Sequence, residues 1–183
     1  MSATDLLRSL FRYQAWADEE FLVAVAQLDL ERRAEDRRAV LRLLNHCHVV
    51  GRIFAAHLTG RRHGYAADNT PETPEPEALR AALAESDRWY LDYLDRVTPA
   101  ELSEAVAFTF TDGDRGCMTR QEMLAHVVTH GGYHRGEAGR ILTRLAAGPA
   151  PGLRLPWDTY AVHLHSTEPA RRRRASAPAS AKS

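Results

Sequence analysis

The stretch that decides the fold is TRQEMLAHVVTHGGYHRGEAGRILTRLAAG, residues 119–148. It opens with a capping box, in which the side chains of Thr119 and Glu122 satisfy each other's free backbone amides. The helix that starts here should continue to about Ala146, because Ala147, Gly148 and Pro149 form a stop signal. Residues 119–148 therefore predict one long helix late in the chain.

Three further segments carry apolar residues at three- and four-residue spacing, which predicts long helices at about Thr4–Gln27, Arg38–Thr59 and Glu77–Val97. The segment GRRHGYAADNTPETPEPEA, residues 60–78, is rich in Pro, Gly and Asn and predicts a long loop. Residues 105–111 alternate as a strand does, and the turn DGDRG follows them, so a small β-hairpin is expected. These elements predict an all-α, four-helix bundle with a long crossover and a hairpin before the last long helix.

Length and composition narrow the class of protein. The chain has 183 residues, 44% of them apolar, and no stretch has the roughly 20 apolar residues that a membrane span needs. The N-terminus does not read as a signal peptide, and two cysteines are too few for a disulfide framework. We therefore expect a cytoplasmic protein with no membrane association.

The charged residues predict a division of the chain at residue 165. Arg171 to Arg174 and Lys182 give residues 166–183 five positive charges against Glu168 alone, so the body, residues 1–165, is mildly acidic. An acidic body lacks the basic surface that nucleic acid requires. The Arg/Ala/Ser-rich tail is predicted to be disordered, since it has too little apolar area to offset its ordering entropy.

Histidines are the candidate metal ligands. The chain has nine, and His126, His130 and His134 follow one another at four-residue steps on the last long helix. Neighbours in this series lie about 6 Å apart along the axis and can share one ion, whereas His126 and His134 are about 12 Å apart. The spacing therefore predicts one ligand pair, either 126/130 or 130/134. Two ordinary surface histidines are the alternative.

A helical pair needs a third ligand from another helix, and His46 fits best. Its position matches the predicted buried stripe of Leu43, Val50 and Phe54. His48 lies about 200° around the same helix and should face elsewhere, and His57 is about 16 Å further along the axis. Spacing alone leaves the choice between His126 and His134 open.

Several stretches together resemble the DinB-like (damage-inducible) family, which includes YfiT-like proteins. They are Tyr13–Asp18 (YQAWAD), Asn45–Phe54 (NHCHVVGRIF) and His126–Glu137 (HVVTHGGYHRGE). The resemblance implies a bundle of the up-down-down-up type, often homodimeric, with a divalent metal held by His46, His130 and His134. Zn or Ni is the metal we expect, although imidazole also suits Cu and Fe. Glu137 departs from the family pattern, which usually has Gln there, so it could be a further ligand or a hydrogen-bond acceptor behind a ligand. Whether His126 also joins the site stays open.

Three neutral imidazoles leave coordination positions open, as in catalytic sites. The resemblance favours a metal-dependent transferase that uses a low-molecular-weight thiol and a small-molecule substrate. The alternatives are a metal-dependent hydrolase or a non-enzymatic, stress-related metal-binding protein. Six residues are candidates to line the pocket: Tyr13, Gln14, Asp18, Tyr133, Arg135 and Glu137.

Overall fold

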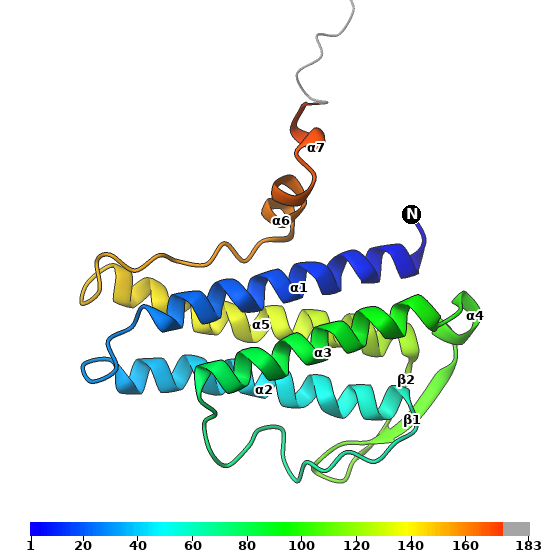
Figure 1. Cartoon of the computed structure of the whole chain (residues 1–183). Coiled ribbons are helices and arrows are strands. Elements are labelled where there is room, and N and C mark those ends of the chain that lie inside the picture. Colours follow the sequence, from blue (N-terminus) through cyan, green and yellow to red (C-terminus); the bar gives the residue numbers. More distant parts are fainter. Residues whose placement is uncertain (174–183) are drawn as a thin grey trace, which may run out of the picture.

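The computed structural model of the chain describes residues 1–173 (Figure 1). Four long helices form a bundle: α1 (Ala3–Ala26), α2 (Ala34–Leu58), α3 (Pro76–Arg96) and α5 (Arg120–Ala146). Helices α1 and α5 run in one direction and α2 and α3 in the other, and the long loop between α2 and α3 brings the chain back along the bundle (Figure 1). The predicted up-down-down-up bundle with a long crossover is confirmed.

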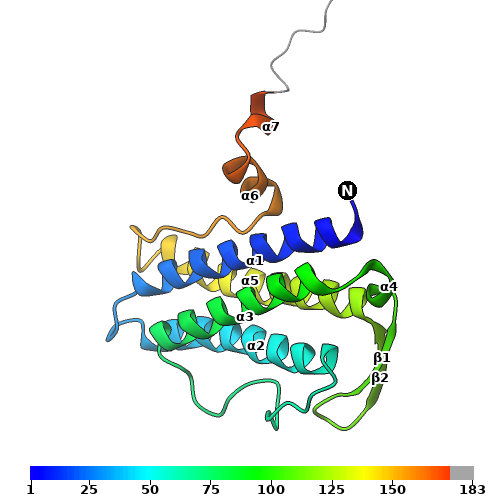
Figure 2. The same ribbon diagram turned by 45° about the vertical axis from the view of Figure 1, so that its right-hand side comes forward.

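The order of the helices around the bundle sets which pairs touch. Helix α1 packs mainly against α3 and α5, and α2 packs mainly against α5 and α3. The turned view of Figure 2 shows the same arrangement, with the hairpin at the end where α3 finishes and α5 begins. The pair α2 and α5, which carries the candidate histidines, is therefore in direct contact.

Helix α2 begins at Ala34, four residues before its predicted start at Arg38. Its N-cap, Arg33, makes no side-chain capping bond, so the usual sequence signal for a start is missing. Glu35 and Asp36 lie in the first turn, where negative side chains interact favourably with the positive end of the helix dipole. The other long helices begin and end within about one residue of the predicted positions.

The predicted hairpin is present as β1 (Ala105–Thr109) and β2 (Arg115–Thr119), which pair antiparallel. Phe108 lies opposite Gly116 in this ladder. A Cβ atom on Gly116 would come within 2.5 Å of the Phe108 ring, so only glycine allows the ring to lie flat across the partner strand. Between α3 and the hairpin, Thr98 and Glu101 form a capping box at the start of the short helix α4 (Pro99–Leu102).

The described part of the chain ends in two short helices. Helices α6 (Tyr160–Thr167) and α7 (Ala170–Arg173) follow α5, and neither was predicted. The predicted division at residue 165 and the disordered tail at 166–183 remain predictions, and residues 174–183 of that tail lie outside the described residues.

Within residues 1–173, no helix is both long enough and apolar enough to cross a bilayer.

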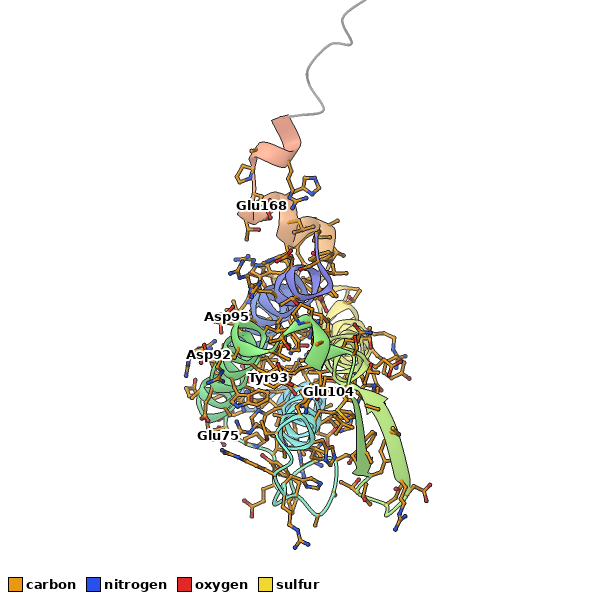
Figure 3. The ribbon with its side chains drawn as sticks, turned by 90° about the vertical axis from the view of Figure 1, so that its right-hand side faces the viewer. Glu75, Asp92, Tyr93, Asp95, Glu104 and Glu168 are labelled. Carbon is orange, nitrogen blue, oxygen red and sulfur yellow. The ribbon has the colours of Figure 1, made fainter. Side chains whose placement is uncertain are left out.

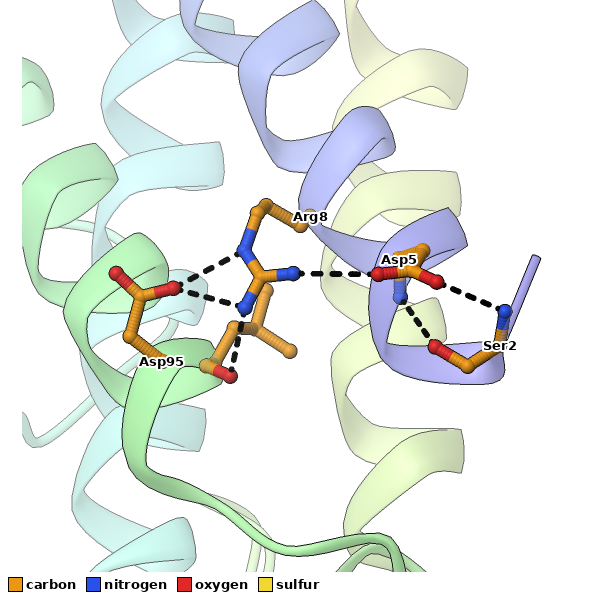
Figure 4. Close-up of polar contacts among 5 residues, drawn as sticks. Ser2, Asp5, Arg8 and Asp95 are labelled. Carbon is orange, nitrogen blue, oxygen red and sulfur yellow. Dashed lines mark hydrogen bonds and ion pairs between the residues drawn. The ribbon is translucent and has the colours of Figure 1, made fainter.

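A salt bridge joins α1 to α3 at one end of the bundle (Figure 4). Ser2 and Asp5 form a capping box at the start of α1. Arg8 reaches from α1 to α3, where its Nη2 atom lies 2.8 Å from the Asp95 carboxylate and also donates to the Leu94 carbonyl. This largely exposed pair joins α1 to α3 but contributes little free energy.

Buried polar side chains form a layer across the middle of the bundle. One apolar cluster, which includes Phe11 and Phe54, fills the hairpin end, and a second, which includes Leu22 and Leu142, fills the other end. All four long helices contribute buried polar residues at positions between these clusters: Gln14, Asp18, Asn45, Ser86, Asp87 and Arg135. We call this set the polar layer. The candidate histidines lie at the same level of α2 and α5.

Candidate metal centre

Three histidines from two packed helices converge beside the polar layer. His46 lies near the middle of α2, and His130 and His134 lie one turn apart near the middle of α5. One side-chain nitrogen from each lies within 4.8 Å of the other two, so the group could hold a metal ion. His46 and His134 have side chains 15% and 18% exposed, so the cluster lies at the edge of the bundle, within reach of solvent.

The spacing within the cluster suits a transition metal. The Nε2 atoms of His46 and His130 are 3.1 Å apart. Two imidazole nitrogens bound to zinc at about 2.0–2.1 Å with a tetrahedral angle would lie roughly 3.3 Å apart. A direct hydrogen bond would also bring these two atoms together, but it would leave His134 without a role. Ion binding accounts for all three rings.

The outer nitrogen of His46 is held by the crossover loop. Its Nδ1 atom lies 2.7 Å from the carbonyl oxygen of Asp68, which makes Nδ1 the protonated nitrogen and frees Nε2 to act as a ligand. The loop is itself anchored to α2, because Asn45 donates to the side chains of Asn69 and Thr70. The residue before His46 therefore positions the loop that orients His46.

Glu137 lies behind His134. Its Oε2 atom is 3.6 Å from His134 Nδ1, a distance that allows attraction but is too long for a hydrogen bond. Glu137 is not among the group that could hold an ion. This geometry favours Glu137 as a partner of the outer ring nitrogen and not as a further ligand.

Burial favours the neutral form of the cluster. Desolvation, followed by the nearby His134, His46 and His126, lowers the pKa of His130 to about 3. Desolvation and the nearby His46 also lower the pKa of His134, although Glu137 acts in the opposite direction. Both rings are therefore neutral at pH 7, which is the form that binds metal.

The remaining histidines lie outside the cluster. His126 packs at a tilt against Phe54, with ring centroids 4.7 Å apart, and does not join the group of three. His48 faces α3, where its Nδ1 atom lies 3.2 Å from Ser86 Oγ, and burial lowers the pKa of His48 to about 4. His57 packs against His63 and Phe108, toward the hairpin.

Arg135, next to His134, lies at the centre of a buried ion network. It is fully buried, with Nη1 3.1 Å from Asp18 on α1 and Nε 2.9 Å from Asp158 in the segment after α5. Tyr13 donates a hydrogen bond to Asp158, and its ring lies beneath the Arg135 guanidinium. Burial lowers the pKa of Arg135, but Asp18 and Asp158 more than offset this effect, so its pKa is raised.

The six residues expected to line a pocket do not lie together in the structure. Tyr13, Asp18 and Arg135 belong to the ion network. Gln14 is buried in the polar layer, whereas the Tyr133 side chain is 74% exposed. A Cβ atom on Gly131 would come within 3.1 Å of Gln14 Oε1, so this glycine permits the close approach of α1 to α5.

Two contributors were missed by sequence reasoning, Asp68 and Asp158. Asp68 acts through its backbone carbonyl, which carries no sequence signal, and Asp158 follows α5 in a segment without helical periodicity. Asn45 gave the one available signal, since a buried amide beside a candidate ligand requires a partner.

In a comparison with protein families, the model of the DinB family matches residues 1–170. Comparison with curated proteins gives no match, and neither does comparison with solved structures.

Proposed function

Since the chain belongs to the DinB family, we propose that His46, His130 and His134 bind one divalent transition metal ion, and that the protein is a metal-dependent transferase for a low-molecular-weight thiol. The convergence of the three imidazoles carries this proposal. The acceptor behind His46 adds support, because metal-binding histidines usually donate their other ring N–H to a carbonyl or carboxylate.

The chain supplies the neutral nitrogen donors and holds them in place. His130 contributes without a large protonation cost at neutral pH, because its pKa is lowered to about 3. Asp68 fixes the orientation of His46, and Glu137 attracts the outer nitrogen of His134. A divalent ion bound here would lower the pKa of a thiol or water that occupies a remaining coordination position.

The thiol would come from a cosubstrate. Cys47, next to His46 in sequence, is partly buried, and desolvation followed by the nearby Asp18 raises the pKa of its thiol to about 12. The group that could hold an ion contains no cysteine. Neither observation provides an internal nucleophile, so an external thiol is the simplest partner for transfer to a small electrophile.

A metal-dependent hydrolase is the second candidate. Glu137 favours it, because a half-exposed carboxylate next to the cluster could accept a proton from an attacking water. Zn and Ni are the metals we favour, and we expect a cytoplasmic homodimer, as the family resemblance implies. A non-enzymatic metal-binding protein would bind the same ion without turnover.

Metal analysis tests the site. The purified protein should carry close to one divalent ion per chain, and His130→Ala should lose it, because two imidazoles leave the ion under-coordinated. His48→Ala is the matched control, since His48 lies on α2 but faces α3. Full occupancy in His130→Ala, or equal loss in His48→Ala, would refute the site.

A thiol screen tests the reaction. A panel of cellular thiols should include one that is conjugated to an electrophile by the metal-loaded protein. Activity should disappear on chelation and return on adding metal. Turnover equal to the metal-stripped control with every thiol would exclude the transferase, while hydrolysis of ester or amide substrates under the same conditions would favour the hydrolase.

A further inference from the structure

A cavity of about 840 Å³ lies between the C-terminal half of α2, the first residues of the crossover loop and α3. Its lining includes Arg52 and Ala56 from α2, the segment 61–65, and Trp89 and Tyr93 from α3. It shares no residue with the histidine cluster. Its volume lies within the usual range for small-molecule sites, about 300–1,000 Å³.

Positive charge is concentrated around this cavity. Arg52, Arg61, Arg62 and Arg96 line it, and Asp92 is the one acidic lining residue. Within the described part of the chain, the guanidinium groups of Arg61, Arg62 and Arg96 have no carboxylate within 4.0 Å, whereas Arg52 lies 3.6 Å from Glu85. Three cations are thus free to bind an anion.

Aromatic side chains form another part of the lining. Trp89 and Tyr93 lie one turn apart on α3, and their rings stack with centroids 5.4 Å apart and planes 17° from parallel. Figure 3 shows Tyr93 on the side of α3 that faces the rest of the bundle, with Asp92 at the outer edge. Such ring faces stack on planar heterocycles with little dependence on sequence or substituent.

A buried polar atom without a partner also belongs to this cavity. His63, which lines it, has a buried Nδ1 atom that makes no hydrogen bond in the structure. Buried polar atoms are nearly always paired, so an unpaired one beside a cavity indicates a place for a ligand or an ordered water.

From these features we propose that the cavity binds a small planar ring that carries a phosphate group, as in a mononucleotide. The arginines would bind the phosphate, because the guanidinium fork matches phosphate oxygens in geometry and charge. The ring would lie against Trp89 or Tyr93, and His63 would offer its free nitrogen to a polar group of the ligand. This site is separate from the metal centre.

Calorimetric titration of the full chain with AMP and UMP tests the proposal, with adenosine and inorganic phosphate as the two halves of the ligand. At least one nucleotide should bind with a Kd below about 1 mM, and each half should bind at least about tenfold more weakly. Binding should persist in His130→Ala, because the metal centre is not involved. Nucleotide binding that disappears in His130→Ala would assign it to the metal centre and overturn the proposal.

The double variant Arg61→Ala/Arg62→Ala should weaken nucleotide binding at least about tenfold, and Trp89→Leu should do the same. Arg32→Ala/Arg33→Ala is the matched control, since it removes two consecutive arginines that directly precede α2, at the end of this helix away from the cavity. A Kd above about 1 mM for both nucleotides, or equal effects of the two double variants, would overturn the proposal. Phosphate that binds as tightly as AMP would reduce the cavity to a simple anion site and refute the role of the rings.

Discussion

His134 and Arg135 are consecutive residues of α5, yet they lie in opposite kinds of polar surroundings. Arg135 is fully buried and has a carboxylate on either side, from Asp18 and Asp158. His134 joins two other neutral rings at the edge of the bundle, and its Nδ1 atom has no hydrogen-bond partner. The charge of Arg135 is met by carboxylates of the chain itself, although its Nη2 atom has no hydrogen-bond partner, whereas the histidine cluster brings together ring nitrogens that could hold an ion.

One helix can serve both regions because consecutive residues point about 100° apart. Arg135 faces α1 and the segment after α5, and His134 faces α2. Polarity alone therefore does not mark a functional site. A charged group that is paired with opposite charges of the chain holds the structure together, whereas ring nitrogens that converge on one point indicate a place for an ion.

The largest expected effect on stability comes from removing Arg135, the cation of the buried ion network. Arg135→Leu should lower the free energy of unfolding by about 3–5 kcal/mol, because two carboxylates lose their buried partner. Urea unfolding in the presence of a chelator measures this change in the free energy of unfolding without a contribution from bound metal. Arg140→Leu, exposed on the same helix, should change stability by less than about 0.5 kcal/mol. A loss below about 1 kcal/mol in Arg135→Leu would show that the network is not a structural element.

A smaller effect should appear on acidification of the metal-free protein. Burial lowers the pKa of His48 to about 4, so between pH 6.5 and 4 the unfolded chain binds a proton that the folded chain does not. Stability should therefore fall as the pH drops through this window, by up to about 3 kcal/mol from His48. His48→Gln should flatten the dependence, and His165→Gln, on the short helix α6, should not. Identical pH profiles for wild type and His48→Gln would contradict this assignment.

The smallest expected effect is on metal affinity and comes from changing Glu137, which lies beside His134 on α5. Glu137→Gln removes the charge behind His134 and should weaken metal affinity about tenfold, or about 1.4 kcal/mol. Competition with a chromophoric chelator measures the change. Glu77→Gln, exposed on α3, provides a control that should leave the affinity unaltered. A loss of the ion equal to that in His130→Ala would instead make Glu137 a ligand.

Local signals in the sequence predicted the four long helices, apart from the start of α2, and reduced the candidate ligands to His46, His130 and either His126 or His134. The capping box at Thr119 and Glu122 predicted the start of α5, and four-residue spacing placed His130 and His134 on one face. The structure brings His46 to the same place, as the pattern of α2 predicted. These features depend on residues within a few turns of each other, or on the packing of two helices with clear apolar faces.

Contacts between distant segments could not be predicted in the same way. Asp158 meets Arg135 only because the segment after α5 folds back across α1, and Asp68 meets His46 only because Asn45 anchors the loop. The inward position of His48 was missed because the polar layer interrupts the apolar stripe from which helix faces are read. Helix α6 has too few apolar residues at helical spacing to be recognised.

The polar layer also restricts how the four long helices can be aligned along the bundle axis. A slip of one helical turn, about 5.4 Å, would move a charged or amide side chain of one helix among the apolar residues of its neighbours. A collapsed chain with the wrong alignment would therefore bury unpaired polar groups at several points at once. Apolar clusters at the two ends drive collapse, and the layer between them selects the single alignment in which His46 stands opposite His130 and His134.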